Sequence, residues 1–159
     1  MSKTQISAPA GEPFIDVSRE FEAPRDLVFR AYSDRDLLVQ WMGPRKYEMV
    51  IDTWEPRAGG SWRFVHRDGE NEWAFHGVFH GEQTPDGMTQ TFEFEGAPGH
   101  VSLERLTLEE RDGRTTARTH SVYQSVADRD AMIASGMEEG MNDGFDRLDE
   151  LLARLATPV

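Results

Sequence analysis

The sequence predicts an α+β fold in which a curved antiparallel sheet packs against one long C-terminal helix. Residues 45–124 alternate with a period of two between turn signals, which is typical of a run of strands. Residues 128–155 instead carry apolar side chains at steps of three and four, which indicates an amphipathic helix. Because the apolar stripe of the helix and one face of the sheet must both be buried, we expect them to pack on each other.

The first structured segment is a strand followed by two short helices. Residues 14–22 alternate, with Ile15 in the apolar phase, and predict the strand. Pro24 suits the first turn of a helix, where its missing N–H needs no partner. Asp34 caps a second short helix that includes Trp41, and a Gly-Pro pair follows as its stop signal.

The middle of the chain predicts six strands joined by short turns. Each turn signal contains glycine together with proline or aspartate. Short connections make consecutive strands antiparallel neighbours, hence a meander. The six expected strands lie near 46–55, 61–67, 72–83, 88–95, 100–110 and 114–124.

The terminal helix contains Gly136, Gly140 and Gly144 at a spacing of four. Each glycine inside a helix costs about 0.5–1 kcal/mol relative to alanine, so their presence needs a physical reason. Another backbone could approach closely there, or the helix could leave empty volume suited to a ligand. A close contact between two subunits is a third interpretation.

Composition limits the classes of function. The 159 residues are long enough for one domain, which we expect at 14–157 after a flexible tail at 1–13. The net charge of −12 repels nucleic acid and anionic lipid headgroups. The chain has no cysteine and no apolar run that could span a membrane. We therefore expect a cytoplasmic monomer or homodimer that binds no nucleic acid and does not insert into membranes.

The histidines do not predict a metal site or a catalytic group. His76 and His80 share a strand face but lie about 13 Å apart, too far to bind one ion. No cysteine nucleophile and no Gly-x-Ser-x-Gly motif is present. We assign no metal, no cofactor and no catalytic residue.

Aromatic side chains share the inner faces of several expected strands and could line a pocket beside the glycine-bearing helix. The same aromatics could equally fill an ordinary core. The strand near 114–124 is rich in small and hydroxyl-bearing residues. It would either enlarge a cavity or form an edge strand that is exposed to water on both faces. His66 or His120 would orient the polar end of a ligand. The candidate cavity residues are Trp41, Trp54, Trp62, Phe64, His66, Phe75, Phe79, Phe92, Phe94, His120, Met132, Gly136, Met137 and Gly140.

Four stretches carry a resemblance to a known family: FEAPRDLVFRAYSDRDLLVQWMGP at 21–44, PRAGGSWRF at 56–64, FEFEGAPGHVSLERLTLEERDG at 92–113 and SVADRDAMIASGMEEGMNDGFDRLDELL at 125–152. The chain resembles the START-like (SRPBCC) superfamily, which has a helix-grip fold. Within it, the chain is similar to the bacterial family that resembles the C-terminal domain of the activator of the ninety-kilodalton heat-shock chaperone ATPase. The resemblance implies a seven-stranded sheet with a cavity beneath the C-terminal helix. Members of the superfamily bind lipids, sterols or polyketides, and a minority catalyse cyclisation or hydrolysis.

We therefore expect a domain that binds a small hydrophobic or amphipathic molecule, of lipid, sterol or polyketide type, between sheet and helix. One alternative is an enzyme of the cyclase or hydrolase kind that uses the same pocket. The other is a chaperone-associated module that binds a protein partner.

Overall fold

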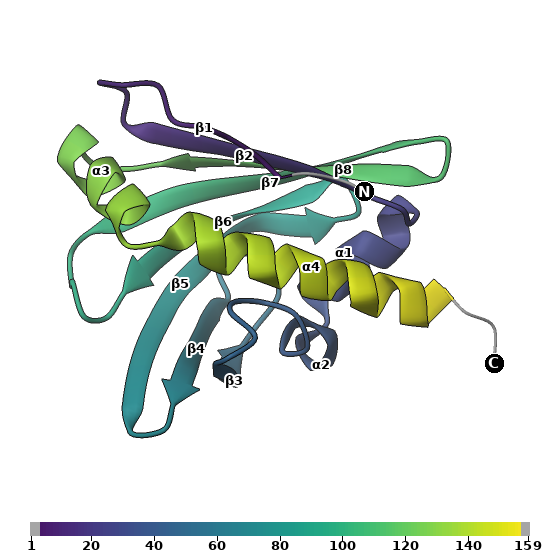
Figure 1. Ribbon diagram of the computed structural model, residues 1–159, viewed down its shortest axis with the longest axis horizontal. Coiled ribbons are helices and arrows are strands. Elements are labelled where there is room, and N and C mark those ends of the chain that lie inside the picture. The colour runs from purple at the N-terminus through teal and green to yellow at the C-terminus, as the bar shows by residue number, and fades with distance from the viewer. Residues whose placement is uncertain (1–3, 157–159) are drawn as a thin grey trace.

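The computed structural model describes residues 4–156, which form an antiparallel sheet with a long helix crossing one of its faces (Figure 1). The sheet has eight strands in the order β1-β2-β8-β7-β6-β5-β4-β3. Helices α1 and α2 lie near one end of the long helix α4, and α3 lies near the other (Figure 1). None of the helices within residues 4–156 has the length and apolar character needed to cross a membrane.

The elements follow the predicted order of strand, short helices, strands and C-terminal helix. The helices are α1 (Arg25–Ser33), α2 (Arg35–Leu38), α3 (Val126–Ala134) and α4 (Met137–Ala156). The strands are β1 (Gln5–Ser7), β2 (Phe14–Phe21), β3 (Glu48–Trp54), β4 (Ser61–Asp68), β5 (Asn71–Thr84), β6 (Gly87–Phe94), β7 (Val101–Arg111) and β8 (Arg114–Val122).

The strand count differs from the expected seven because a short strand, β1, precedes the others. In β1, Gln5 pairs with Ser18 and Ile6 with Val17 of β2. This strand lies inside the segment 1–13 that we expected to be a flexible tail. Three residues are too few to show a period of two, so the pattern gave no signal there. Residues 1–3 of that segment, and residue 157 of the expected domain, lie outside the described residues.

The C-terminal segment forms two helices, so the prediction of one continuous helix is wrong. Gly136 has a φ of +86°, a left-handed conformation that ends α3 immediately before α4 begins. The apolar spacing continues through the break, which explains why periodicity did not reveal it. Gly136 therefore ends α3, and it does not create empty volume beside a continuous helix.

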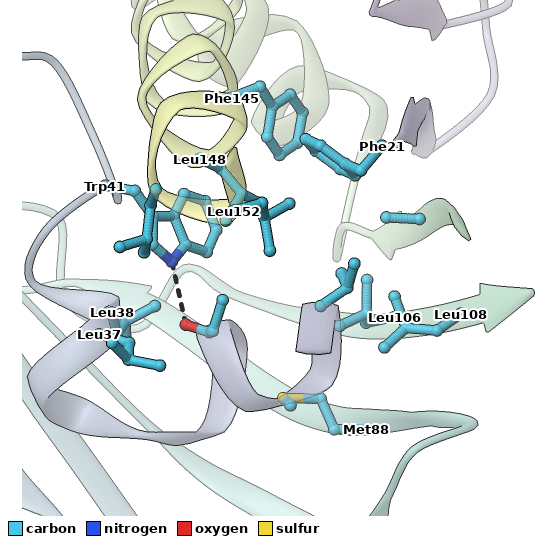
Figure 2. Packing of buried hydrophobic residues seen from close by; sticks show 14 of the residues in the cluster. Phe21, Leu37, Leu38, Trp41, Met88, Leu106, Leu108, Phe145, Leu148 and Leu152 are labelled. Carbon is cyan, nitrogen blue, oxygen red and sulfur yellow. Dashed lines mark hydrogen bonds between the residues drawn. The ribbon is translucent and has the colours of Figure 1, made fainter. Parts of the chain in front are cut away.

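The part of α4 from Gly144 onwards is packed into the core. Phe145, Leu148 and Leu152 are buried there beside Trp41, and Phe145 faces Phe21 of β2 (Figure 2). The indole N–H of Trp41 donates a hydrogen bond of 3.0 Å to the backbone oxygen of Ala31, which fixes the loop after α2 on α1.

Gly144 explains the close fit of α4 at this point. A Cβ added at Gly144 would lie 3.1 Å from the backbone nitrogen of Gly43 and 3.2 Å from the oxygen of Trp41. The interpretation of a close backbone approach is thus confirmed for Gly144. The helix is held against the loop that follows α2.

Arg19 of β2 fixes α4 to the sheet. Its side chain is 3% exposed, and it donates hydrogen bonds to Asp146, at 2.9 Å, and to Asp149. The guanidinium carbon also lies 5.7 Å from the ring centroids of Phe21 and Phe145. A buried cation thus joins the edge of the core to two carboxylates of α4.

Replacing Arg19 by alanine should lower the free energy of unfolding by about 2 kcal/mol. The variant loses charge-assisted hydrogen bonds and leaves the space of a large side chain unfilled. The matched control is Arg25→Ala, which removes the more exposed ion pair with Asp86 and should cost at most about 1 kcal/mol. Urea unfolding measures both variants, and equal midpoints would contradict the anchoring role of Arg19.

Candidate functional site

A cavity of about 330 Å³ lies between the inner face of the sheet and the N-terminal half of α4. The first two turns of α4 contribute Met137, Gly140 and Met141, which are half-buried, unlike the packed residues further along the helix. At Gly140 an added Cβ would lie 3.3 Å from Pro44, so the small residue lets the loop and the helix approach at the cavity edge. The closely packed part of α4 begins directly after these two turns, at Gly144.

The sheet supplies a wall of aromatic rings. Trp62 and Phe64 of β4 have their ring centroids 5.3 Å apart, and Phe75 of β5 lies 5.2 Å from Phe64. Phe92 of β6 lies 5.3 Å from Phe75. Alternation along each strand places these side chains on the same inner face, so the rings form a continuous apolar surface.

Methionines supply much of the remaining wall. Five of the six methionines within residues 4–156 line the cavity, namely Met42, Met88, Met132, Met137 and Met141. Methionine is unbranched and its thioether is polarisable, so such a surface adjusts to differently shaped partners. The helix side of the cavity is therefore more adaptable than the sheet side.

A second hollow of about 620 Å³ adjoins the cavity and forms its entrance. Gly43, His66, Phe75, Phe92, Tyr123 and Met132 line both volumes. At the rim, Nδ1 of His100 lies 2.9 Å from a carboxylate oxygen of Asp128 in α3. The entrance is thus bordered by α3 and by the loop after β6.

One carboxyl group lies inside the apolar cavity. Glu104 of β7 shares the inward phase of its strand with Leu106, and the amide of Gln90 donates a hydrogen bond of 3.2 Å to one of its oxygens. The hydroxyl of Ser121 lies 3.3 Å from the other oxygen. Burial raises the pKa of Glu104, and these hydrogen bonds oppose the rise. Burial also raises the pKa of the nearby Tyr123, and the charge of Glu104 adds to that effect.

His66 lies on the opposite side of the cavity from Glu104, on β4. Burial lowers its pKa to about 4, and the charge of Arg147 adds to the lowering. Its Nδ1 atom is buried and has no hydrogen-bond partner within residues 4–156. Beside it, Gly43 has a φ of +84°, and an added Cβ there would lie 2.1 Å from Cε1 of His66. Gly43 thus gives the imidazole the room that it occupies.

The structure brings most of the predicted residues around the cavity and places four elsewhere. Phe94 lines the entrance, and Phe79 is fully buried in the core against Trp54. Gly136 is exposed in the break between α3 and α4. His120 points to the outer face of the sheet, where Nδ1 lies 2.6 Å from Asp16, so it cannot orient a ligand in this cavity. The residues that line the cavity are Trp41, Trp54, Trp62, Phe64, His66, Phe75, Phe92, Met132, Met137 and Gly140.

Sequence reasoning missed the polar group of the cavity. Glu104, Gln90 and Tyr123 were not among the predicted residues, although all three line it. The signal was present in β7, where Glu104 falls in phase with Leu106 and Leu108, both of which are buried. A charged residue in an otherwise apolar phase marks either a strand edge or a buried polar site. Leu103 lies in the opposite phase and is apolar although it is exposed, so the sequence did not show which phase of β7 faces inward.

The site does not have the composition of a metal centre. Among residues 4–156, no group of three or more histidine, cysteine, aspartate or glutamate side chains is placed to hold an ion. The polar cluster of the cavity contains one carboxyl group, one amide and hydroxyls.

A curved antiparallel sheet that holds a long C-terminal helix above a cavity defines the helix-grip class of START-like (SRPBCC) proteins. The family model for Activator of Hsp90 ATPase homolog 1-like protein matches residues 22–153. The chain belongs to that family. Among curated proteins, none matches the chain.

Solved structures confirm the fold. A protein from Rhodobacter sphaeroides is 25% identical, with a TM-score of 0.87 over 96% of this chain and 99% of that one. Protein Ms6760 from Mycobacterium smegmatis is 21% identical, with a TM-score of 0.86 over 98% and 99%. CalU16 from Micromonospora echinospora is 20% identical, with a TM-score of 0.62 over 96% of this chain and 74% of its own. Family and fold together support a ligand-binding or chaperone-associated module in general.

Substituting Gly43 by alanine should destabilise the protein by more than the backbone strain alone. A positive φ costs a non-glycine residue about 1 kcal/mol or more, and here the new methyl group would also displace His66. The matched control is Gly99→Ala, because Gly99 has a φ of +89° with nothing within 4 Å of an added Cβ. Thermal unfolding should show the larger decrease in melting temperature for Gly43→Ala. Equal decreases for the two variants would mean that the contact with His66 does not contribute to stability.

The Glu104→Gln variant should become progressively more stable than the wild type as pH rises. Because the folded-state pKa of Glu104 is raised, its neutral form favours folding below about pH 4.3, the unfolded value, and this contribution is lost as pH rises through the folded pKa. The glutamine variant does not titrate, so its advantage should grow across that window by about 1.4 kcal/mol for each unit of pKa shift.

Urea unfolding of both proteins over a pH series measures this difference. Glu109→Gln is the control, because Glu109 lies exposed on the same strand. A stability difference between wild type and Glu104→Gln that does not change with pH would show that the carboxyl pKa is not raised.

Proposed function

We propose that this protein binds a small amphipathic molecule, of lipid, sterol or polyketide-like type, in the cavity beneath α4. The observation that carries the proposal is an apolar volume of about 330 Å³ between the sheet and α4 that contains one polar cluster and has an entrance. Small-molecule sites commonly combine apolar walls with a few convergent polar groups. The apolar body of the ligand would lie against Trp62, Phe64 and Phe92, and its polar end would reach Glu104 and Ser121.

The positions of the ionisable groups favour binding over acid–base catalysis of the cyclase or hydrolase kind. His66 is on β4 and Glu104 is on β7, with β5 and β6 between them in the sheet. Three strand spacings correspond to about 14 Å along the sheet. Two groups so far apart do not act together on one reacting atom.

The cavity also favours a small ligand over a protein partner. A chaperone-associated module would predict an exposed apolar patch in place of an internal volume. On the outer face of the sheet, Leu103 and Val122 form a short exposed apolar pair. The aromatic and methionine surface of the cavity is more extensive than this pair.

Filling the cavity tests the proposal. Thr119 of β8 lines the cavity, whereas its neighbour His120 points to the opposite face. Thr119→Phe should occupy the volume and lower the affinity for an uncharged apolar probe such as N-phenyl-1-naphthylamine by about tenfold. His120→Phe adds a ring of the same kind outside the cavity and should leave the affinity unchanged.

Native mass spectrometry of the purified proteins gives an independent readout. A non-covalent adduct carried by the wild type and by His120→Phe, but absent from Thr119→Phe, would support the proposal and identify the ligand after extraction. Circular dichroism establishes that both variants are folded. Equal probe affinity in the three proteins would mean that the cavity is not the binding site.

A further inference from the structure

We infer that the cavity selects ligands that carry a basic nitrogen, with the Glu104 carboxylate as the partner of the ligand's ammonium group. The inference rests on the proposed function, because it specifies the chemical class of molecule that the same cavity takes. It assigns Glu104 as the residue that determines specificity.

Within residues 4–156, the carboxyl group of Glu104 has no charged partner. Its hydrogen-bond partners are the amide of Gln90, at 3.2 Å, and the hydroxyl of Ser121, at 3.3 Å, and both are neutral. Gln90 and Ser121 are also its register neighbours on β6 and β8, so the cluster is built by three adjacent strands. Each carboxylate oxygen has further capacity to accept a hydrogen bond, and the part of Glu104 that is accessible faces the cavity.

The charges around the cavity favour a cation. Within residues 4–156, neither the cavity nor its entrance is lined by a lysine or an arginine. The other titratable groups of the cavity are Tyr32, His66 and Tyr123. Burial raises the pKa of both tyrosines and lowers that of His66 to about 4, so all three are neutral near pH 7. Glu104 is therefore the cavity group able to carry a charge, and that charge is negative.

The walls of the cavity suit an ammonium group as well. In the register of the sheet, Phe92 pairs with Ser102, the next residue of the inward phase beside Glu104. A ring face near the carboxylate attracts an ammonium group that has lost its water. The acidic surface of the whole protein, with a net charge of −12, also draws cations towards the entrance.

Binding of an ammonium group would stabilise the ionised form of Glu104, which burial alone disfavours. The carboxyl group of Glu104 is already withdrawn from water in the free protein. An ammonium ligand must lose its own hydration, but it gains a charge-assisted hydrogen bond in a low-dielectric site. A carboxylate or phosphate at the same position would face repulsion, and an alcohol would form a neutral hydrogen bond.

Three probes with one hydrocarbon chain and different end groups test the inference: octylamine, octanol and octanoic acid. Quenching of tryptophan fluorescence reports binding, because Trp41, Trp54 and Trp62 line the cavity. The wild type should bind octylamine about tenfold more tightly than octanol, and octanoic acid more weakly than either. In Glu104→Gln the advantage of the amine should disappear while the affinity for octanol is retained. Glu109→Gln, an exposed change of the same charge, should behave as the wild type.

The pH dependence separates recognition by charge from a merely structural role. Octylamine remains protonated from mildly acidic to neutral pH, so its affinity for the wild type should rise with pH as Glu104 ionises. Its affinity for Glu104→Gln should stay flat. An amine advantage that is absent from the wild type, or that survives in Glu104→Gln, overturns the inference and leaves ligand binding supported by octanol. Failure of all three probes to bind would overturn the proposed function itself.

Discussion

Attachment of α4 between Gly144 and Asp149 governs the rest of this structure. Arg19 binds Asp146 and Asp149 from the sheet side, and Gly144 lets the helix backbone approach the loop at Trp41. These contacts hold this part of the helix against the sheet and the loop after α2. The first two turns of α4 extend from it over the curved sheet, and the cavity lies beneath them.

One ionisable residue, Glu104, adds a carboxyl group to a cavity that is otherwise mostly apolar. Most of the lining is aromatic or thioether surface, which binds by shape and area and discriminates weakly between apolar molecules. Glu104 contributes a carboxyl group that is costly to bury and is held by neutral partners. Natural proteins tolerate such local instability mainly where it serves a site. For the proposed ligand, the walls would provide affinity and Glu104 would provide selectivity.

The sequence was sufficient for the order of elements, the antiparallel sheet and most aromatic residues of the cavity, because periodicity and turn signals are local. It was insufficient where contacts between distant parts of the chain determine an element boundary or the orientation of a side chain. Gly136 ends a helix within an unbroken apolar pattern, and β1 is too short to alternate. His120 and Thr119 are neighbours with opposite orientations, so the face of β8 had to be known before either could be assigned. Arg19 and Glu104 were overlooked because a charged residue in an apolar phase usually indicates exposure.

The methionines of the cavity also determine how it responds to oxidants. Met132, Met137 and Met141 come from the helix side and lie around the space that a ligand would fill. Conversion of their thioethers to sulfoxides would place polar, chiral groups on a surface that is otherwise apolar. A ligand in the cavity would shield these sulfur atoms from peroxide. Oxidation of the three methionines would make the wall of the proposed binding site more polar and weaken its contact with an apolar ligand.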